Sequence, residues 1–289
     1  RTSRAAPSVS LALSKHPSIV QIYEWGSHQH QDYFVLEFVG SSAGMLLQVH
    51  PGGIEKELAL TIARDAAEAL EFAHRRSIVH RDVKPANILL ELEERRAKLA
   101  DFGLASLFDP EQGTGAGPPG GTPAYMAPEV ARGQAGSPAS DIFSLGATLY
   151  ELLTGAVPYE GWAAETVLGN AQAGQVVPIT RRRNDLPRDV AAVVQRALEP
   201  NPDRRFASAT DMREAIDALL APRAAASAPQ APDEQSMLEM KRAKLRAYKR
   251  GRDAKRAHAE RLAAEAYQNA LDQFRDGEAF ERVKQLESA

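Results

Sequence analysis

The stretch HRDVKPANILL, residues 80 to 90, constrains the fold more than any other part of the chain. Five of its first eight positions are polar, and three aliphatic residues follow at once. A short apolar run bounded by polar residues is typical of a buried strand. The pattern therefore predicts a polar loop that leads directly into the core. The polar residues are His80, Arg81, Asp82, Lys84 and Asn87.

The residues after this loop predict a hairpin. ILL and AKLA are short apolar strands separated by the charged ELEERR, so we expect them to pair. A hairpin places the residue before its first strand beside the residue after its second, which brings Asn87 next to Asp101. Amide and carboxylate oxygens are hard ligands that suit Mg²⁺ and leave positions for phosphate oxygens.

A phosphate bound at that metal would lie within reach of two further side chains of the loop. Asp82 could orient a hydroxyl and accept its proton as the bond to phosphorus forms. Lys84, two residues on, could neutralise charge on the transferred group. The alternative is a charged surface loop before a strand, without a catalytic role. The types of polar residue and their spacing suit phosphoryl transfer.

Composition narrows the class of protein. The chain has 289 residues and is 44% hydrophobic, which is enough for one large domain or two smaller ones. It contains no cysteine, so disulfides and thiolate metal sites are excluded. No apolar run approaches the roughly 20 residues that cross a bilayer, and no signal pattern opens the chain. We therefore expect no transmembrane segment and a cytoplasmic location.

Hydrophobic periodicity predicts the other main elements. A polar turn between two runs of β-branched and aromatic residues indicates a hairpin, and four segments have a helical pattern. PASDIFSLGATLYELLTG is apolar on nearly every side and should be a buried helix that ends at Gly155. The hairpin is expected within residues 19–39, and the other helices at 54–76, 187–199 and 208–220.

Together, HRDVKPAN and DFGLA resemble the catalytic loop and the metal-binding loop of eukaryotic-type (Hanks-type) protein kinases. Lys84 resembles the serine/threonine-specific branch, and the chain is most similar to bacterial kinases of this class. The resemblance runs from about Val9 to Leu220. It implies an α+β fold of two lobes, ATP and Mg²⁺ as cofactors, Ser or Thr hydroxyls of proteins as phosphate acceptors, and a role in signal transduction.

This resemblance also implies the domain organisation. Residues 1–221 would be the kinase domain, with 1–39 a remnant of the N-terminal lobe and 40–221 the mainly helical C-terminal lobe. Beyond the resemblance, composition indicates an Ala- and Pro-rich linker at 222–236 and a charged helical tail at 237–289.

The FVLEFV strand resembles the hinge that holds adenine in this family. The carbonyl of Glu37 and the amide of Val39 would bind the base. Leu36 would be the gatekeeper, and Leu89 would lie beneath the ring. These four positions are otherwise ordinary core-strand residues.

Further positions match structural residues of the family. In GTPAYMAPE, Thr122 would bridge Asp82 and Lys84, and Glu129 would pair with a distant arginine. Arg205 fits that partner, although a solvated helix-capping arginine stays open as an alternative because Arg204 is adjacent. In SDIFSLG, Asp141 resembles the buried aspartate that holds the backbone of the catalytic loop.

Regulation is implied by Arg81, which resembles the arginine that receives a phosphate on the activation segment. Thr114 is the available acceptor, and Thr122 is a weaker one because of its structural role. Ser106 stands where the family often adds a basic residue to this pocket, so an ordinary loop is an equal alternative.

The family's glycine-rich loop, strand lysine and helix glutamate are not found, and the position of that glutamate falls on Pro7. We therefore expect an incomplete N-terminal lobe and weak activity of this chain alone. The alternative is a non-catalytic, pseudokinase-like binding scaffold that keeps the motifs as relics.

The tail is strongly basic, with nine Lys or Arg between residues 241 and 256 against the single Asp253. A solvated helix face is the favoured interpretation. Contact with an anionic surface or a partner protein stays open. Tyr248 is the only aromatic residue in this stretch, which argues against stacking on nucleic acid.

Overall fold

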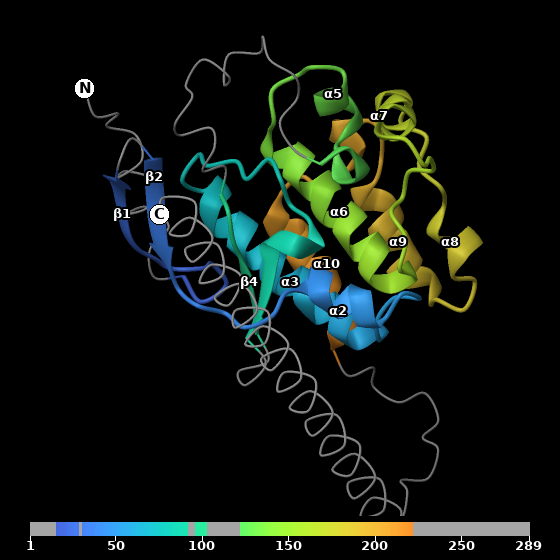
Figure 1. Ribbon diagram of the computed structural model, residues 1–289. Coiled ribbons are helices and arrows are strands. Elements are labelled where there is room, and N and C mark those ends of the chain that lie inside the picture. The colour runs from blue at the N-terminus through green and yellow to red at the C-terminus, as the bar shows by residue number, and fades with distance from the viewer. Residues whose placement is uncertain (1–15, 29–30, 92–95, 103–121, 222–289) are drawn as a thin grey trace, which may run out of the picture. The chain divides into compact units, whose positions relative to one another are not determined.

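The computed structural model describes residues 16–28, 31–91, 96–102 and 122–221 (Figure 1). The chain divides into two units, residues 1–222 and 223–289, and the described residues all lie in the first. The expectations for Pro7, Ser106 and Thr114, and those for the linker and the tail, therefore fall outside the described residues.

Two antiparallel hairpins form the β-structure of the described residues. Strands β1 (Ile22–His28) and β2 (Gln31–Leu36) pair within the segment that the sequence indicated. Strands β3 (Ile88–Glu91) and β4 (Arg96–Leu99) pair with Ile88 opposite Leu99. Both predicted hairpins are therefore confirmed.

Helices make up most of the rest, so the α+β class is confirmed. The four predicted helices correspond to α3 (Lys56–His74), α6 (Pro138–Thr154), α9 (Arg188–Ala197) and α10 (Ala209–Leu220). The sequence did not indicate four further helices, α2 (Ala43–Val49), α5 (Pro128–Ala131), α7 (Ala164–Ala173) and α8 (Ile179–Arg182). Three 3₁₀ turns complete the described elements: η1 (Pro85–Asn87), η3 (Pro123–Tyr125) and η4 (Pro202–Arg204).

Helix α6 is the centre of the core, with thirteen of its seventeen residues buried. It packs against α3 and α9, and α10 covers α3 (Figure 1). Ser137 caps its first turn, and Gly155 ends it in the left-handed conformation with φ of 70°. A Cβ on Gly155 would lie 1.9 Å from the carbonyl oxygen of Pro51, so only glycine fits there.

The β3–β4 hairpin is tied to the chain segments on both sides of β1 and β2. Val20 N donates to Leu99 O at 3.0 Å, and Leu99 N donates to Ser18 O at 2.8 Å. On the other side, Leu90 N donates to Ser41 O at 2.9 Å. Among the described residues, no helix combines the length and the apolar character needed to span a bilayer.

Candidate active site

The loop before β3 is held by one buried carboxylate from helix α6. Asp141 is fully buried, and its two oxygens accept hydrogen bonds from the backbone N–H groups of His80 and Arg81, each at 2.8 Å. The Nε2 atom of His74, on α3, lies 2.8 Å from the same carboxylate. These partners compensate a charge in an apolar helix. The contact that was expected of Asp141 is therefore present.

Arg81 takes an uncommon backbone conformation at this anchor. Its φ is 71°, in the left-handed region that costs a non-glycine residue about 1 to 2 kcal/mol. The hydrogen bond to Asp141 offsets this strain. The side chain of Arg81 is exposed and lies close to Gly136.

His80 connects this loop to the segment around Asp101. Its Nε2 lies 2.8 Å from Ala100 O, and its Nδ1 accepts from Asp82 N at 3.2 Å. These two contacts fit a neutral imidazole with the proton on Nε2. The ring also packs against Phe102, with 4.7 Å between ring centroids. His80 therefore holds both neighbours of Asp101 in the chain.

The side chains of Asp82, Lys84, Asn87 and Thr122 form one polar cluster. Lys84 Nζ lies 2.6 Å from Asp82 Oδ2 and 2.9 Å from Thr122 Oγ1. Thr122 donates to Asp82 Oδ1 through its backbone N–H and its hydroxyl, both at 3.2 Å. Thr122 therefore bridges Asp82 and Lys84.

Asn87 fixes the other side of Asp82. Its Nδ2 donates to the backbone oxygen of Asp82 at 2.8 Å and to Oδ2 at 3.1 Å. Because the amide nitrogen is engaged on that side, the amide oxygen is directed elsewhere and can serve as a ligand.

The hairpin register brings Asn87 and Asp101 to the same end of β3 and β4. Ala100 N donates to Asn87 O at 2.8 Å, and Asp101 is the next residue. Asp101 is exposed and has a φ of 61°. In the described part of the chain, no group of three or more His, Cys, Asp and Glu side chains is arranged to hold a metal. The candidate oxygen set is instead one amide and one carboxylate, which suits Mg²⁺ with phosphate oxygens and waters.

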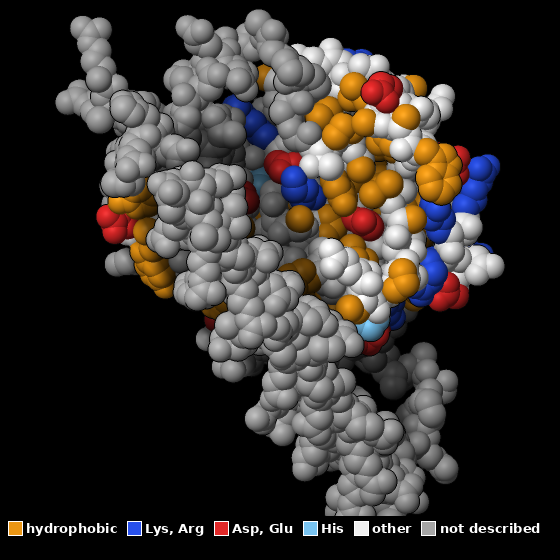
Figure 2. Space-filling model, in the orientation of Figure 1, with side chains coloured by type: hydrophobic (Ala, Val, Ile, Leu, Met, Phe, Trp, Pro, Cys, Tyr) orange, Lys and Arg blue, Asp and Glu red, His pale blue; other side chains and the backbone are white. Residues whose placement is uncertain are grey.

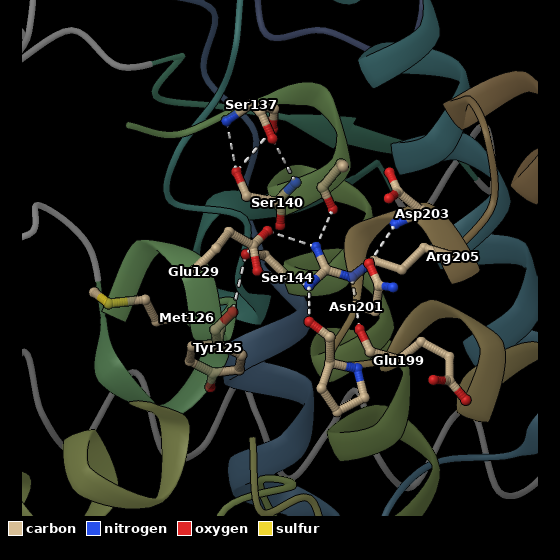
Figure 3. A network of polar contacts seen from close by, with 12 residues as sticks. Tyr125, Met126, Glu129, Ser137, Ser140, Ser144, Glu199, Asn201, Asp203 and Arg205 are labelled. Carbon is tan, nitrogen blue, oxygen red and sulfur yellow. Dashed lines mark hydrogen bonds and ion pairs between the residues drawn. The ribbon is translucent and has the colours of Figure 1, made fainter. Parts of the chain in front are cut away.

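A buried ion pair joins Glu129 on α5 to Arg205, which follows η4 (Figure 3). Arg205 donates to Glu129 through two parallel hydrogen bonds of 2.7 Å. The guanidinium also donates to the carbonyl oxygens of Ala139, Glu199 and Pro200. Arg204 is exposed, so the structure selects Arg205 as the partner of Glu129.

Three of the four expected hinge residues lie at or just after the end of β2, within residues 36–39 (the hinge segment), and the fourth lies on β3. Leu36 ends β2, and Glu37 and Val39 follow it. Leu89 lies on β3, and an isolated bridge between Leu89 and Ser42 connects it to the segment after the hinge. The backbone just after the hinge segment is therefore tied to β3, the strand that follows Asn87.

The supporting roles of two histidines were not predicted from the sequence. His74 contacts Asp141 from α3, and His80 holds the segment around Asp101. His80 begins the polar stretch and was visible there, but its partners are fixed only by the fold. His74 is the last residue of α3, and nothing in the sequence pattern there indicated a contact with Asp141.

Two histidines with a lowered pKa, the buried His80 and the partly buried His16, predict how the stability of the fold depends on pH. Burial lowers the pKa of His80 below its ordinary value of 6.5, and this outweighs the attraction of Asp141. Burial lowers the pKa of His16 in the same way. Below pH 6.5 the unfolded chain therefore binds more protons than the folded chain does. The free energy of unfolding should be constant above pH 6.5 and should fall below it, and His80 should contribute up to about 1.4 kcal/mol per pH unit to this fall.

Urea unfolding of the whole chain at pH 7.5 and pH 5.5 measures this effect. His80→Gln removes one of the two groups and should reduce the loss of stability between these pH values. Equal losses in the wild type and the variant would contradict the assignment of a neutral, buried His80.

Comparison with known proteins places these contacts in a family context. Residues 8–216 match the family model described as "Protein kinase domain". "Serine/threonine-protein kinase PknB" of Mycolicibacterium smegmatis is 39% identical over 211 residues, which cover 70% of this chain and 33% of that protein. The PknB of Mycobacterium leprae is 36% identical over 207 residues, with the same coverage. "Serine/threonine-protein kinase PknK" of Mycobacterium bovis is 38% identical over 207 residues, which cover 71% of this chain and 18% of that protein. The chain thus spans 33% of the length of the PknB relatives.

Proposed function

Because the chain belongs to the protein kinase family, we propose that it transfers the γ-phosphate of ATP to Ser and Thr hydroxyls of proteins. The observation that carries this proposal is the cluster of Asp82, Lys84, Asn87 and Thr122 beside the segment of Asp101. The names of the relatives, which are serine/threonine-protein kinases, support it.

Asp82 is the proposed base. Its carboxylate is held by Thr122 on one oxygen and by Asn87 and Lys84 on the other, so its orientation is fixed before a substrate arrives. A hydroxyl that reaches this carboxylate can give up its proton as it attacks phosphorus. Lys84 is about a quarter exposed, so its ammonium can also face the transferred phosphoryl group and balance its charge.

Asn87 and Asp101 are the proposed ligands of Mg²⁺. When bound, this ion would neutralise charge on the phosphates of ATP. The oxygens of these two residues fit a hard cation, and His80 holds the segment of Asp101 in place from both sides. The carbonyl of Glu37 and the amide of Val39 would bind adenine, with Leu36 as gatekeeper and Leu89 beneath the ring.

Acceptor proteins would approach an open part of the surface. Figure 2 shows hydrophobic side chains gathered over the region of α5 and α7. Trp162, in the loop before α7, is fully exposed. Such a surface can take part in contacts with a protein chain. Four expectations stay predictions. They are regulation of activity through Arg81, Thr114 and Thr122, a cytoplasmic location, weak activity of this chain, and a partner for the tail.

The change Asp82→Asn tests the proposed reaction. The amide keeps the size of the side chain but cannot accept the proton of the attacking hydroxyl. We expect transfer of labelled phosphate from Mg–ATP to a mixture of Ser- and Thr-containing peptides to fall by about 100- to 10,000-fold. Nucleotide binding by the same variant should stay close to that of the wild type.

The exposed Asp211 in the first turn of α10 provides a matched control, because Asp211→Asn should leave transfer unchanged. Equal transfer by the wild type and Asp82→Asn would refute the role of Asp82. Nucleotide binding without any transfer by the wild type would favour the scaffold alternative.

A further inference from the structure

Lys98 on β4 is a charged residue near the proposed site for which the proposed reaction has no role. Only 12% of its side chain is exposed. Its ammonium forms ion pairs with Glu37 of the hinge segment and with Glu91 of β3, the latter at 3.1 Å. An ammonium so little exposed to water requires such compensation.

The strand register shows which face of the hairpin carries this ammonium. Lys98 is the residue opposite Leu89, and side chains directly opposite in a register lie on the same face of a sheet. Glu91 shares that face because it lies two residues beyond Leu89. Lys98 is also three residues before Asp101. It therefore lies beside the proposed adenine contact and on the strand that leads to the proposed metal ligand.

Glu37 is held from two directions. Its backbone N–H donates to Gln21 O at 2.8 Å, and its Oε2 accepts from Gln21 N at 3.2 Å. Its other carboxylate oxygen, Oε1, contacts Lys98. The carboxylate of Glu37 therefore connects the start of β1, the hinge and β4.

The charges within this cluster keep Lys98 ionised and paired with both carboxylates. Burial lowers the pKa of Lys98, but the hydrogen bond that it donates to Glu37 and the negative charges of Glu37 and Glu91 outweigh burial and raise the pKa overall. The ammonium thus stays charged at neutral pH. If Lys98 moved away, two half-buried carboxylates would be left without their shared counter-ion.

We propose that Lys98 is a positioning residue that ties the hinge to the β3–β4 hairpin and so fixes the distance between the adenine end and the metal end of the nucleotide site. This inference rests on the proposed function, since it requires a nucleotide that bridges the two ends. Lys98 itself need not touch the nucleotide.

Binding of Mg–ADP and of adenosine to the whole chain, measured by titration calorimetry, tests the inference. Mg–ADP would contact both the hinge segment and the proposed metal ligands, so its affinity depends on the distance between them. Adenosine would contact only the hinge segment. Lys98→Met should raise the Kd of Mg–ADP by about tenfold and that of adenosine by less than about twofold. A change that only loosened the fold would weaken both ligands equally.

The chain offers matched variants. Glu37→Gln keeps an acceptor for Gln21 N but loses the charge, and should repeat the effect of Lys98→Met. Lys98→Arg should restore much of the affinity for Mg–ADP. Arg96→Met removes an exposed basic residue of the same strand and should change neither Kd. If Lys98→Met fails to fold by circular dichroism, Glu37→Gln decides the question.

The outcomes separate this inference from the function on which it rests. A wild type that does not bind Mg–ADP overturns both. A wild type that binds Mg–ADP, with the same affinity in Lys98→Met and Glu37→Gln, overturns the positioning role alone. Equal losses for adenosine and Mg–ADP also overturn it.

Discussion

Replacement of Arg205 by methionine is expected to lower the free energy of unfolding by about 3 to 5 kcal/mol. The side chain of Arg205 is fully buried, and it satisfies both oxygens of Glu129 and three backbone carbonyl groups. Methionine has a similar volume but no donor, so Glu129 would stay buried with an uncompensated charge. Most of the lost stability comes from leaving the Glu129 carboxylate buried without a partner. The attraction within an intact buried ion pair is little larger than the free energy needed to remove both charges from water.

Urea unfolding at neutral pH measures this cost, with Arg204→Met as the matched control. Arg204 is adjacent and exposed, and its replacement should change stability by less than about 0.5 kcal/mol. The double variant Glu129→Met with Arg205→Met should recover a large part of the loss, since both charges are gone. Equal effects of Arg204→Met and Arg205→Met would contradict the buried pair.

Replacement of Asp141 by asparagine should have the largest effect on activity among the structural residues. The Asp141 carboxylate receives the N–H groups of His80 and Arg81 on different oxygens. An amide offers only one oxygen, so one N–H group would face the NH₂ group of asparagine. The loop would shift, and a displacement of about 1 Å at the reacting groups can cost about 100-fold in rate.

The rate of phosphate transfer and the stability of Asp141→Asn should be measured together. We expect a loss of transfer of about 100-fold and, because a buried N–H group loses its acceptor, destabilisation of about 1 to 3 kcal/mol. Asp211→Asn again serves as the control, since it alters an exposed acid in the first turn of another helix. Unchanged transfer in a folded Asp141→Asn variant would show that this carboxylate does not position the loop.

Local sequence patterns were sufficient to predict the strands and the helix that position the candidate site. The apolar strands around ELEERR fixed the β3–β4 hairpin, and hairpin geometry then placed Asn87 next to the segment of Asp101. The nearly uniform apolar character of residues 138–154 predicted the buried helix, and Gly155 marked its end. Helix α7 was not indicated, because only Ala171 of its ten residues is buried and its apolar stripe is weak.

Contacts between segments that are distant in the sequence could be predicted only where both partners belong to motifs of the family. Glu129 and Arg205 are 76 residues apart, and their pairing was expected from the resemblance alone. Lys98 and Glu37 are 61 residues apart and belong to no such motif, so only the fold identifies them. The positive φ angles of Arg81 and Asp101 also had no signal, because neither residue is glycine.

The central claim is that Asn87 and Asp101 share a Mg²⁺ ion with the phosphates of a nucleotide, and the most direct measurement is ADP affinity with and without Mg²⁺. Asp101→Asn is a suitable variant because asparagine tolerates the left-handed backbone at this position. We predict that Mg²⁺ tightens ADP binding by about tenfold or more in the wild type, which corresponds to about 1.4 kcal/mol, and has little effect in Asp101→Asn. The same Mg²⁺ effect in both proteins, or none in the wild type, would contradict the account.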